Sequence, residues 1–176
     1  DRDGEEIALH GLNHTDNYLQ KHQGLVGLHA SFTVGDNTLQ KAVELMNRYN
    51  SGIHVHVAED FYDQQHCLEK YKKRVVDRFN EYGIIQSPKT ILVHCIHIND
   101  VERELIKNGN CWVAENTESN LNNNVGYFKS IGLGERIMLG TDGMHSNMMQ
   151  SAKSAYFFGQ GFDQIDFSDT YKRFRN

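Results

Sequence analysis

The sequence lacks the features that typify secreted, membrane-spanning or nucleic-acid-binding proteins. Its three cysteines are far apart and fit neither a disulfide framework nor a CxxC zinc site, so we expect buried, reduced thiols. No apolar run is long enough to span a bilayer, and the chain opens on a charged segment, so we expect no signal peptide. No dense run of lysine and arginine occurs, and the formal net charge is −5. These absences predict a cytoplasmic protein without a nucleic-acid partner or a membrane partner.

The composition is that of a folded, water-exposed domain. The 176 residues are 39% hydrophobic and 23% charged, which suits one domain with a sizeable core. Mean hydropathy is −0.60, polar for a self-contained α/β domain, so some of the surface is expected to belong against another segment. There is no starting methionine, which fits a trimmed chain. We expect one domain over residues 1–176, with its core between residues 24 and 160.

Apolar spacing along the chain predicts strands that alternate with helices. The expected strands are 24–30, 53–58, 91–94, 111–114 and 137–140. The expected helices are 5–22, 37–49, 63–82, 100–107, 125–131 and 151–158, and residues 163–176 show no clear pattern.

Strands that alternate with helices imply a parallel sheet with right-handed crossovers. Two architectures have this pattern, an open doubly wound sheet and part of a (β/α)8 barrel. A complete barrel needs eight strands and roughly 250 residues. About five β/α units are present, so the barrel interpretation predicts a partial TIM barrel whose other strands lie outside this sequence.

Polar residues follow nearly every predicted strand. His29, His56 and His94 close the first three strands, Asn120 follows the fourth, and Asp142 follows the fifth. Ligands and catalytic groups gather at the carboxyl ends of parallel strands. Imidazole and carboxylate groups are normal zinc ligands. The pattern therefore predicts a metal site at this edge of the sheet.

Each of these signals is weak by itself. A lone histidine is more often structural or solvated than a ligand, and His10, His14, His22 and His66 on polar segments are interpreted in that way. A His-x-His pair lies on one face of any strand, and Gly-Thr-Asp-Gly is an ordinary turn. The ordered occurrence of several such residues, each at a strand end, carries the prediction.

Five segments resemble successive motifs of the amidohydrolase superfamily. They are GLHASFTVGD (27–36), HVHVAED (54–60), LVHCIH (92–97), VAENTESN (113–120) and LGTDGMHSN (139–147). They are most similar to its deaminase and chlorohydrolase branch, which includes guanine deaminase, and within it to the SsnA aminohydrolases. The resemblance covers roughly residues 24–150 and implies barrel strands four to eight.

The resemblance implies a role for each matching residue. His56 would be a metal ligand, and Glu59 the general acid/base that carries a proton to the leaving group. His94 would orient the attacking water or the substrate. Asp142 would be both a metal ligand and the base that activates the water, and His29 would contact the substrate. The implied cofactor is a divalent metal, zinc or alternatively iron.

Other positions are assigned less directly. Asn120 is expected to contact the substrate with His29, and His54, deeper on the same strand face as His56, is expected to have a core or packing role. The sequence departs from the family pattern where relatives carry histidine and proline near Glu115 and Thr117. No strand with the family's first His-x-His ligand pair precedes residue 24.

The leading hypothesis is thus a fragment of a metal-dependent aminohydrolase that hydrolyses a C–N bond of a purine-like heterocycle. With half of the ligand set outside the sequence, the isolated chain is expected to be inactive and can lack metal. Open sheet edges predict a homo-oligomer. The alternatives are a non-catalytic binding or assembly domain of the same descent, and an unrelated open sheet. Neither a phosphate loop nor a GxGxxG turn supports the latter.

Overall fold

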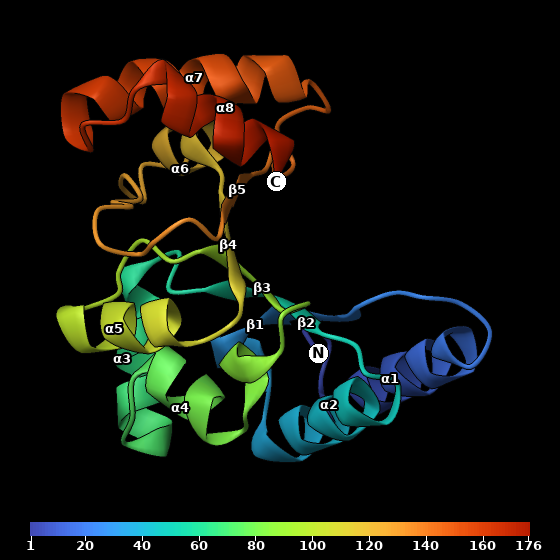
Figure 1. Cartoon of the computed structure of the whole chain (residues 1–176). Coiled ribbons are helices and arrows are strands. Elements are labelled where there is room, and N and C mark those ends of the chain that lie inside the picture. Colours follow the sequence, from blue (N-terminus) through green and yellow to red (C-terminus); the bar gives the residue numbers. More distant parts are fainter.

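A computed structural model describes all residues, 1–176, as an α/β structure built on one parallel sheet (Figure 1). The strands are β1 (Val26–Ala30), β2 (Ile53–Val57), β3 (Ile91–His94), β4 (Trp112–Glu115) and β5 (Ile137–Leu139). The helices are α1 (Glu5–Leu19), α2 (Asp36–Arg48), α3 (Phe61–Tyr71), α4 (Val75–Glu81), α5 (Asp100–Asn108), α6 (Thr117–Asn122), α7 (Met148–Phe162) and α8 (Phe167–Arg175). Short 3-10 helices cover Ser31–Thr33 and Ile84–Gln86. No helix combines the length and the apolar character needed to cross a membrane.

Strand order decides between the two architectures that the sequence left open. All neighbouring strands are parallel, and the spatial order β1-β2-β3-β4-β5 follows the chain without a reversal. A doubly wound sheet requires a point where the order reverses. Monotonic order is the arrangement of consecutive units in a (β/α)8 barrel, so the structure is a five-stranded barrel segment.

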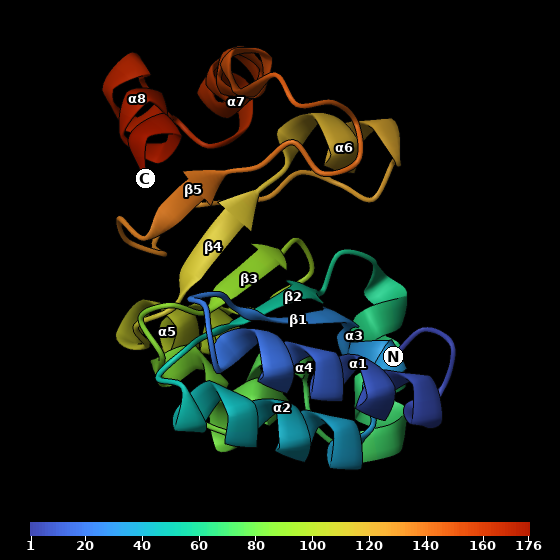
Figure 2. The ribbon, with the colours of Figure 1, turned by 90° about the vertical axis from the view of Figure 1, so that its right-hand side faces the viewer.

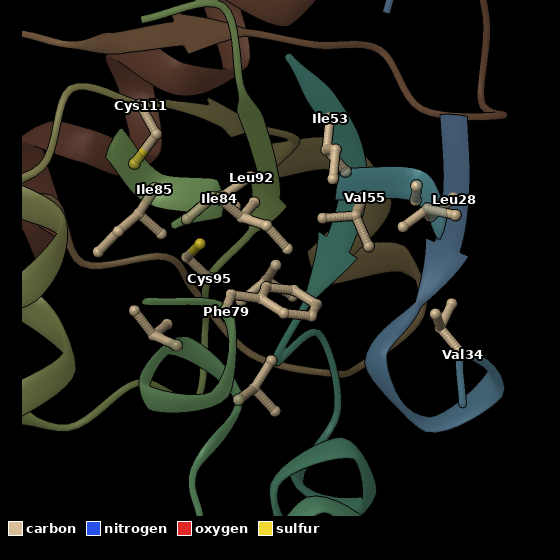
Figure 3. Close-up of a cluster of buried hydrophobic side chains, with 14 of the residues drawn as sticks. Leu28, Val34, Ile53, Val55, Phe79, Ile84, Ile85, Leu92, Cys95 and Cys111 are labelled. Atoms are coloured by element: carbon tan, nitrogen blue, oxygen red, sulfur yellow. The ribbon is translucent and has the colours of Figure 1, made fainter. Parts of the chain in front are cut away.

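Helices pack on one face of the sheet, and the other face lacks such a layer. Alternate residues of β1 and β2 are buried, and all of them except Ala30 belong to a core of 27 buried residues. Figure 3 shows Leu28, Val55 and Leu92 directed toward Phe79 and Ile84 on the helical side. In Figure 2, α1, α2 and α4 lie on one side of β1–β3, whereas α7 and α8 lie beyond β5. The opposite strand face carries the histidines.

The prediction of a core or packing role for His54 is wrong for this structure. His54 shares the face of His56, as expected, but it is exposed. Strand alternation turns it away from the helices, and no helix covers that face. In a complete barrel this face would line the interior.

Two helix predictions also need correction. The expected helix 63–82 is two helices, because Lys72 adopts a left-handed conformation with φ of 57° and ends α3. The expected helix 125–131 is irregular: Gly126 has φ of 121°, and the main-chain N–H groups of Ser130 and Ile131 donate to Asp163. The helix of this region is α6, earlier in the chain.

The final segment, where no pattern was expected, contains α8. Asp166 caps it: its carboxylate accepts from the main-chain N–H of Asp169, and the Asp169 side chain accepts from the N–H of Asp166. This capping box is a local signal that the sequence already contained.

Candidate active site

Three histidines from adjacent strands form a row at the carboxyl end of the sheet. The ring centroids of His29 and His56 are 5.5 Å apart, and those of His56 and His94 are 5.2 Å apart, both in edge-to-face geometry. Parallel pairing brings the carboxyl ends of β1, β2 and β3 side by side, although the register pairs His56 with Ala30 and His94 with Val57. The predicted convergence of these residues is confirmed by this geometry.

Two carboxylates lie close to His94, at one end of this row. Nε2 of His94 lies 3.5 Å from Oε2 of Glu59 and 4.0 Å from Oδ2 of Asp142. The side chain of His94 is fully buried, whereas those of Glu59 and Asp142 are 30% and 27% exposed. The carboxylates therefore line the open side of the site, and His94 forms its floor.

Strained backbone conformations accompany these residues. Ala58, His94, Cys95 and Asp142 have positive φ values of 48°, 73°, 52° and 51°, which non-glycine residues rarely adopt. Such strain costs on the order of 1–3 kcal/mol per residue and concentrates at functional sites. The main-chain N–H of Ala58 is held by the Asp63 carboxylate at 2.8 Å, which fixes the turn that presents Glu59.

Burial and neighbouring charge set the ionisation of the site. Burial, and then the nearby His94 and His29, lower the pKa of His56 to about 4, so its imidazole is neutral near pH 7. For Asp142, burial raises the pKa, but hydrogen bonds from Ser119 and Gly143, with His94 and His56 nearby, lower it on balance. A neutral imidazole and an ionised carboxylate are the states in which these groups bind metal.

The donor set fits a divalent metal. Ligand atoms of His56, Glu59 and His94 all lie within 4.8 Å of one another. Nε2 of His94 is buried without a hydrogen-bond partner while it faces two carboxylates. Imidazole nitrogen and carboxylate oxygen are the zinc ligands of catalytic sites.

Asn120 lies behind His94 and not in the open part of the site. It is fully buried, and its Oδ1 is 2.8 Å from Nδ1 of His94. Its burial leaves no side-chain surface for direct contact with a substrate, which argues against the substrate-binding role expected for it. His29 does lie in the row, where its Nδ1 is 3.1 Å from the Thr33 hydroxyl.

Sequence reasoning missed Ser119, whose hydroxyl donates to Oδ2 of Asp142 at 2.5 Å. No local pattern singles it out, because its partner is 23 residues further along the chain. The departure at Glu115 lies outside the site: this carboxylate is buried and accepts from Thr117 and Arg173. His10, His14 and His22 are exposed and lie outside the site, as expected.

The fold and this cluster define the chain as part of a parallel α/β barrel with a group of histidine and carboxylate side chains, able to hold a metal ion, at the carboxyl ends of its strands. The family model described as "Amidohydrolase family" matches residues 15–170. The chain therefore belongs to the amidohydrolase family, and the family resemblance stated from its motifs is confirmed.

Curated relatives include two kinds of deaminase. The chain is 34% identical over 145 residues to a 5'-deoxyadenosine deaminase of Methanococcus vannielii, a match that covers 78% of this chain and 34% of the relative. It is 36% identical over 126 residues to a 5-methylthioadenosine/S-adenosylhomocysteine deaminase of Caldanaerobacter subterraneus, covering 70% and 29%. The chain thus spans about a third of the length of these relatives.

Solved structures agree on the fold. The guanine deaminase of E. coli superimposes with a TM-score of 0.81 at 20% identity, over 94% of this chain and 42% of that one. An adenosine deaminase of Xanthomonas campestris with bound zinc gives a TM-score of 0.78 at 20% identity, over 91% and 38%. The predicted partial barrel is therefore confirmed.

Proposed function

We propose that the protein to which this chain belongs is a metal-dependent aminohydrolase that removes an amino group from a purine-like heterocycle. The observation that carries the proposal is the arrangement of Glu59 and Asp142 about Nε2 of His94, with His56 alongside. The names of the curated relatives support the substrate class, since they are deaminases of adenosine derivatives.

We assign His56 and Asp142 as ligands of the metal, with zinc as the metal. A divalent metal, when bound, supplies a Lewis acid that promotes the ionisation of water near neutral pH. Asp142 accepts a proton from the attacking water, and His94 orients this water. Glu59, more exposed and on the open side, carries a proton to the departing ammonia. His29, at the outer end of the histidine row, contacts the heterocycle.

Further properties belong to the same proposal. Residues 1–176 act as one domain, the protein functions in the cytoplasm without nucleic-acid or membrane partners, and its group within the family is SsnA. This segment alone does not turn over substrate, because about two thirds of the length of its relatives is outside it.

Zinc binding and ammonia release test the proposal together. Zinc content is measured after dialysis for the full-length protein and its His56→Ala variant, and ammonia release is followed with 5'-deoxyadenosine, 5-methylthioadenosine and guanine. We expect zinc in the parent, ammonia from at least one substrate, and loss of both in the variant. A parent that holds no zinc and releases no ammonia would instead support a binding or assembly domain.

A further inference from the structure

The short helix α6 connects three parts of the molecule through three consecutive residues. Glu118 contacts α7, Ser119 contacts the segment after β5, and Asn120 contacts the end of β3. Two of these contacts reach residues of the candidate active site. Nothing in the proposed chemistry uses α6 directly, so its hydrogen bonds require a separate explanation.

Asn120 controls the ring of His94 from behind. Its Oδ1 accepts from Nδ1 of His94 at 2.8 Å, and both side chains are fully buried. A neutral imidazole carries one proton, so a proton on Nδ1 leaves the lone pair on Nε2. Nε2 is the atom that faces Glu59 and Asp142. The amide of Asn120 thereby sets both the ring plane and the atom that is offered to the site.

Ser119 fixes the carboxylate of Asp142 in a similar way. Its hydroxyl donates to Oδ2 of Asp142 at 2.5 Å and accepts from Nδ2 of Asn123 at 3.4 Å. The other oxygen, Oδ1, accepts from the main-chain N–H of Gly143 at 2.7 Å. With both oxygens bound, the plane of this carboxylate is set before any ligand arrives. A metal-binding side chain whose orientation is already fixed loses less conformational entropy when the metal binds.

Glu118 holds α6 in place on its far side. Its carboxylate accepts from Nε2 of Gln150 at 3.0 Å and from the Ser154 hydroxyl at 2.8 Å, both on α7, and it also pairs with His145. These contacts tie α6 to α7 while Ser119 and Asn120 face the site. The contacts with α7 therefore fix the position of α6, and α6 in turn holds Ser119 and Asn120 against the site.

We propose that Ser119 and Asn120 are positioning residues of this site, with Ser119 orienting Asp142 and Asn120 setting the tautomer of His94. The inference rests on the proposed function for its consequence, because orientation of these groups matters only if they bind metal and move protons. The hydrogen-bond geometry itself is independent of that function.

The tautomer of His94 gives a direct test without any assay of activity. The full chain is labelled with 15N-histidine and studied by NMR at pH 8, with His94→Gln used only to assign the resonance. We expect the Nδ1–H tautomer in the parent, meaning the protein without substitutions, and in Asn120→Asp, which keeps a hydrogen-bond acceptor. We expect a shift toward Nε2–H in Asn120→Leu, while Asn122→Leu, an exposed position on the same helix, leaves the tautomer unchanged. An Nε2–H tautomer in the parent, or an unchanged one in folded Asn120→Leu, overturns the role of Asn120.

Zinc titration tests Ser119 with its own matched control. Loss of a group that orients a metal ligand typically costs 10–100-fold in metal affinity, so we expect Ser119→Ala to weaken zinc binding by that factor. Ser119→Thr keeps the hydroxyl and should restore most of the affinity. Equal affinities for Ala and Thr overturn the role of Ser119. If the parent itself binds no zinc, the proposed function fails and the role of Ser119 fails with it, whereas the tautomer experiment still decides the role of Asn120.

Discussion

Glu59 is the residue whose replacement separates metal binding from proton transfer most clearly. It contacts the site from its open side, 3.5 Å from Nε2 of His94, and a glutamine at this position keeps its shape without the titratable proton. General acid/base groups contribute typically 10²–10⁴-fold to rate. We expect Glu59→Gln in the full-length protein to lose about that factor in kcat, measured as ammonia release, and to retain its zinc.

The matched control is Glu69→Gln, an exposed carboxylate on α3. Activity of Glu59→Gln within about tenfold of the parent would remove Glu59 from the proton pathway, since general acid/base catalysis supplies more than that.

We expect Asp63 to make the stability of the fold depend on pH. Burial raises its pKa from 3.8 to about 6, although the N–H groups of Ala58 and Phe32 favour the charged form. The folded state therefore binds more protons than the unfolded state between these values. The contribution of Asp63 to stability is fully present below about pH 3.8 and is lost as pH rises through about 6. A shift of this size corresponds to at most about 3 kcal/mol.

Asp63→Asn should remove this dependence, because the amide keeps an oxygen for the Ala58 N–H and does not ionise. Urea denaturation of the parent and the variant across pH 3.5–7 gives the difference in unfolding free energy. We expect the variant to gain stability relative to the parent through this window. A difference that stays constant with pH would mean that Asp63 titrates normally.

At the scale of elements, one buried ion pair fastens α8 to the sheet. Nη1 of Arg173 donates to Oε2 of Glu115 at 2.6 Å, and the Glu115 side chain is fully buried. Burial raises the pKa of Glu115, and the charge of Arg173 opposes that rise. Removal of one partner of a buried pair typically costs 3–5 kcal/mol, because the other charge stays buried.

We therefore expect Arg173→Met to lower the unfolding free energy by roughly 3–5 kcal/mol. Adding Glu115→Gln in the same chain should recover part of the loss, since the uncompensated charge disappears. Lys172→Met, exposed on the same helix, is the control. Urea denaturation measures all four chains, and a loss no larger than that of the control would show that the pair does not hold α8.

At the scale of the whole molecule, an apolar surface supports the prediction of self-association. A groove of about 460 Å³ between α7 and α8 is lined mainly by apolar side chains. Met149, Phe157 and Phe167 at this groove are 68%, 60% and 71% exposed. Large exposed apolar patches mark interaction sites. The outer sheet edges are less open than expected, since Asp1 accepts from the His29 N–H and Asn176 donates to the Ile137 carbonyl.

We accordingly expect a dimer that forms through the α7–α8 surface. Sedimentation velocity over a concentration series should show a dimer for the parent and a monomer for the double variant Phe157→Glu, Phe167→Glu. Ile7→Glu, an exposed apolar position on α1, should leave the dimer intact. A parent that stays monomeric at the highest concentration contradicts the prediction.

The sequence by itself determined the parallel strand–helix alternation and the placement of His29, His56, His94 and Asp142 at strand ends. Both are local consequences of side-chain periodicity, because a strand of known phase and direction fixes which residue closes it. The ordered motifs added the family, because their spacing along the chain is itself sequence information.

Only the tertiary structure decided the rest, because it depends on contacts between residues far apart in sequence. Strand order selected the barrel, and no local pattern contains strand order. Arg173 reaches Glu115 across 58 positions to dock α8, and Ser119 and Asn120 reach Asp142 and His94 across 23 and 26. Burial, which shifts the pKa values of His56 and Asp63, likewise exists only once the chain has folded.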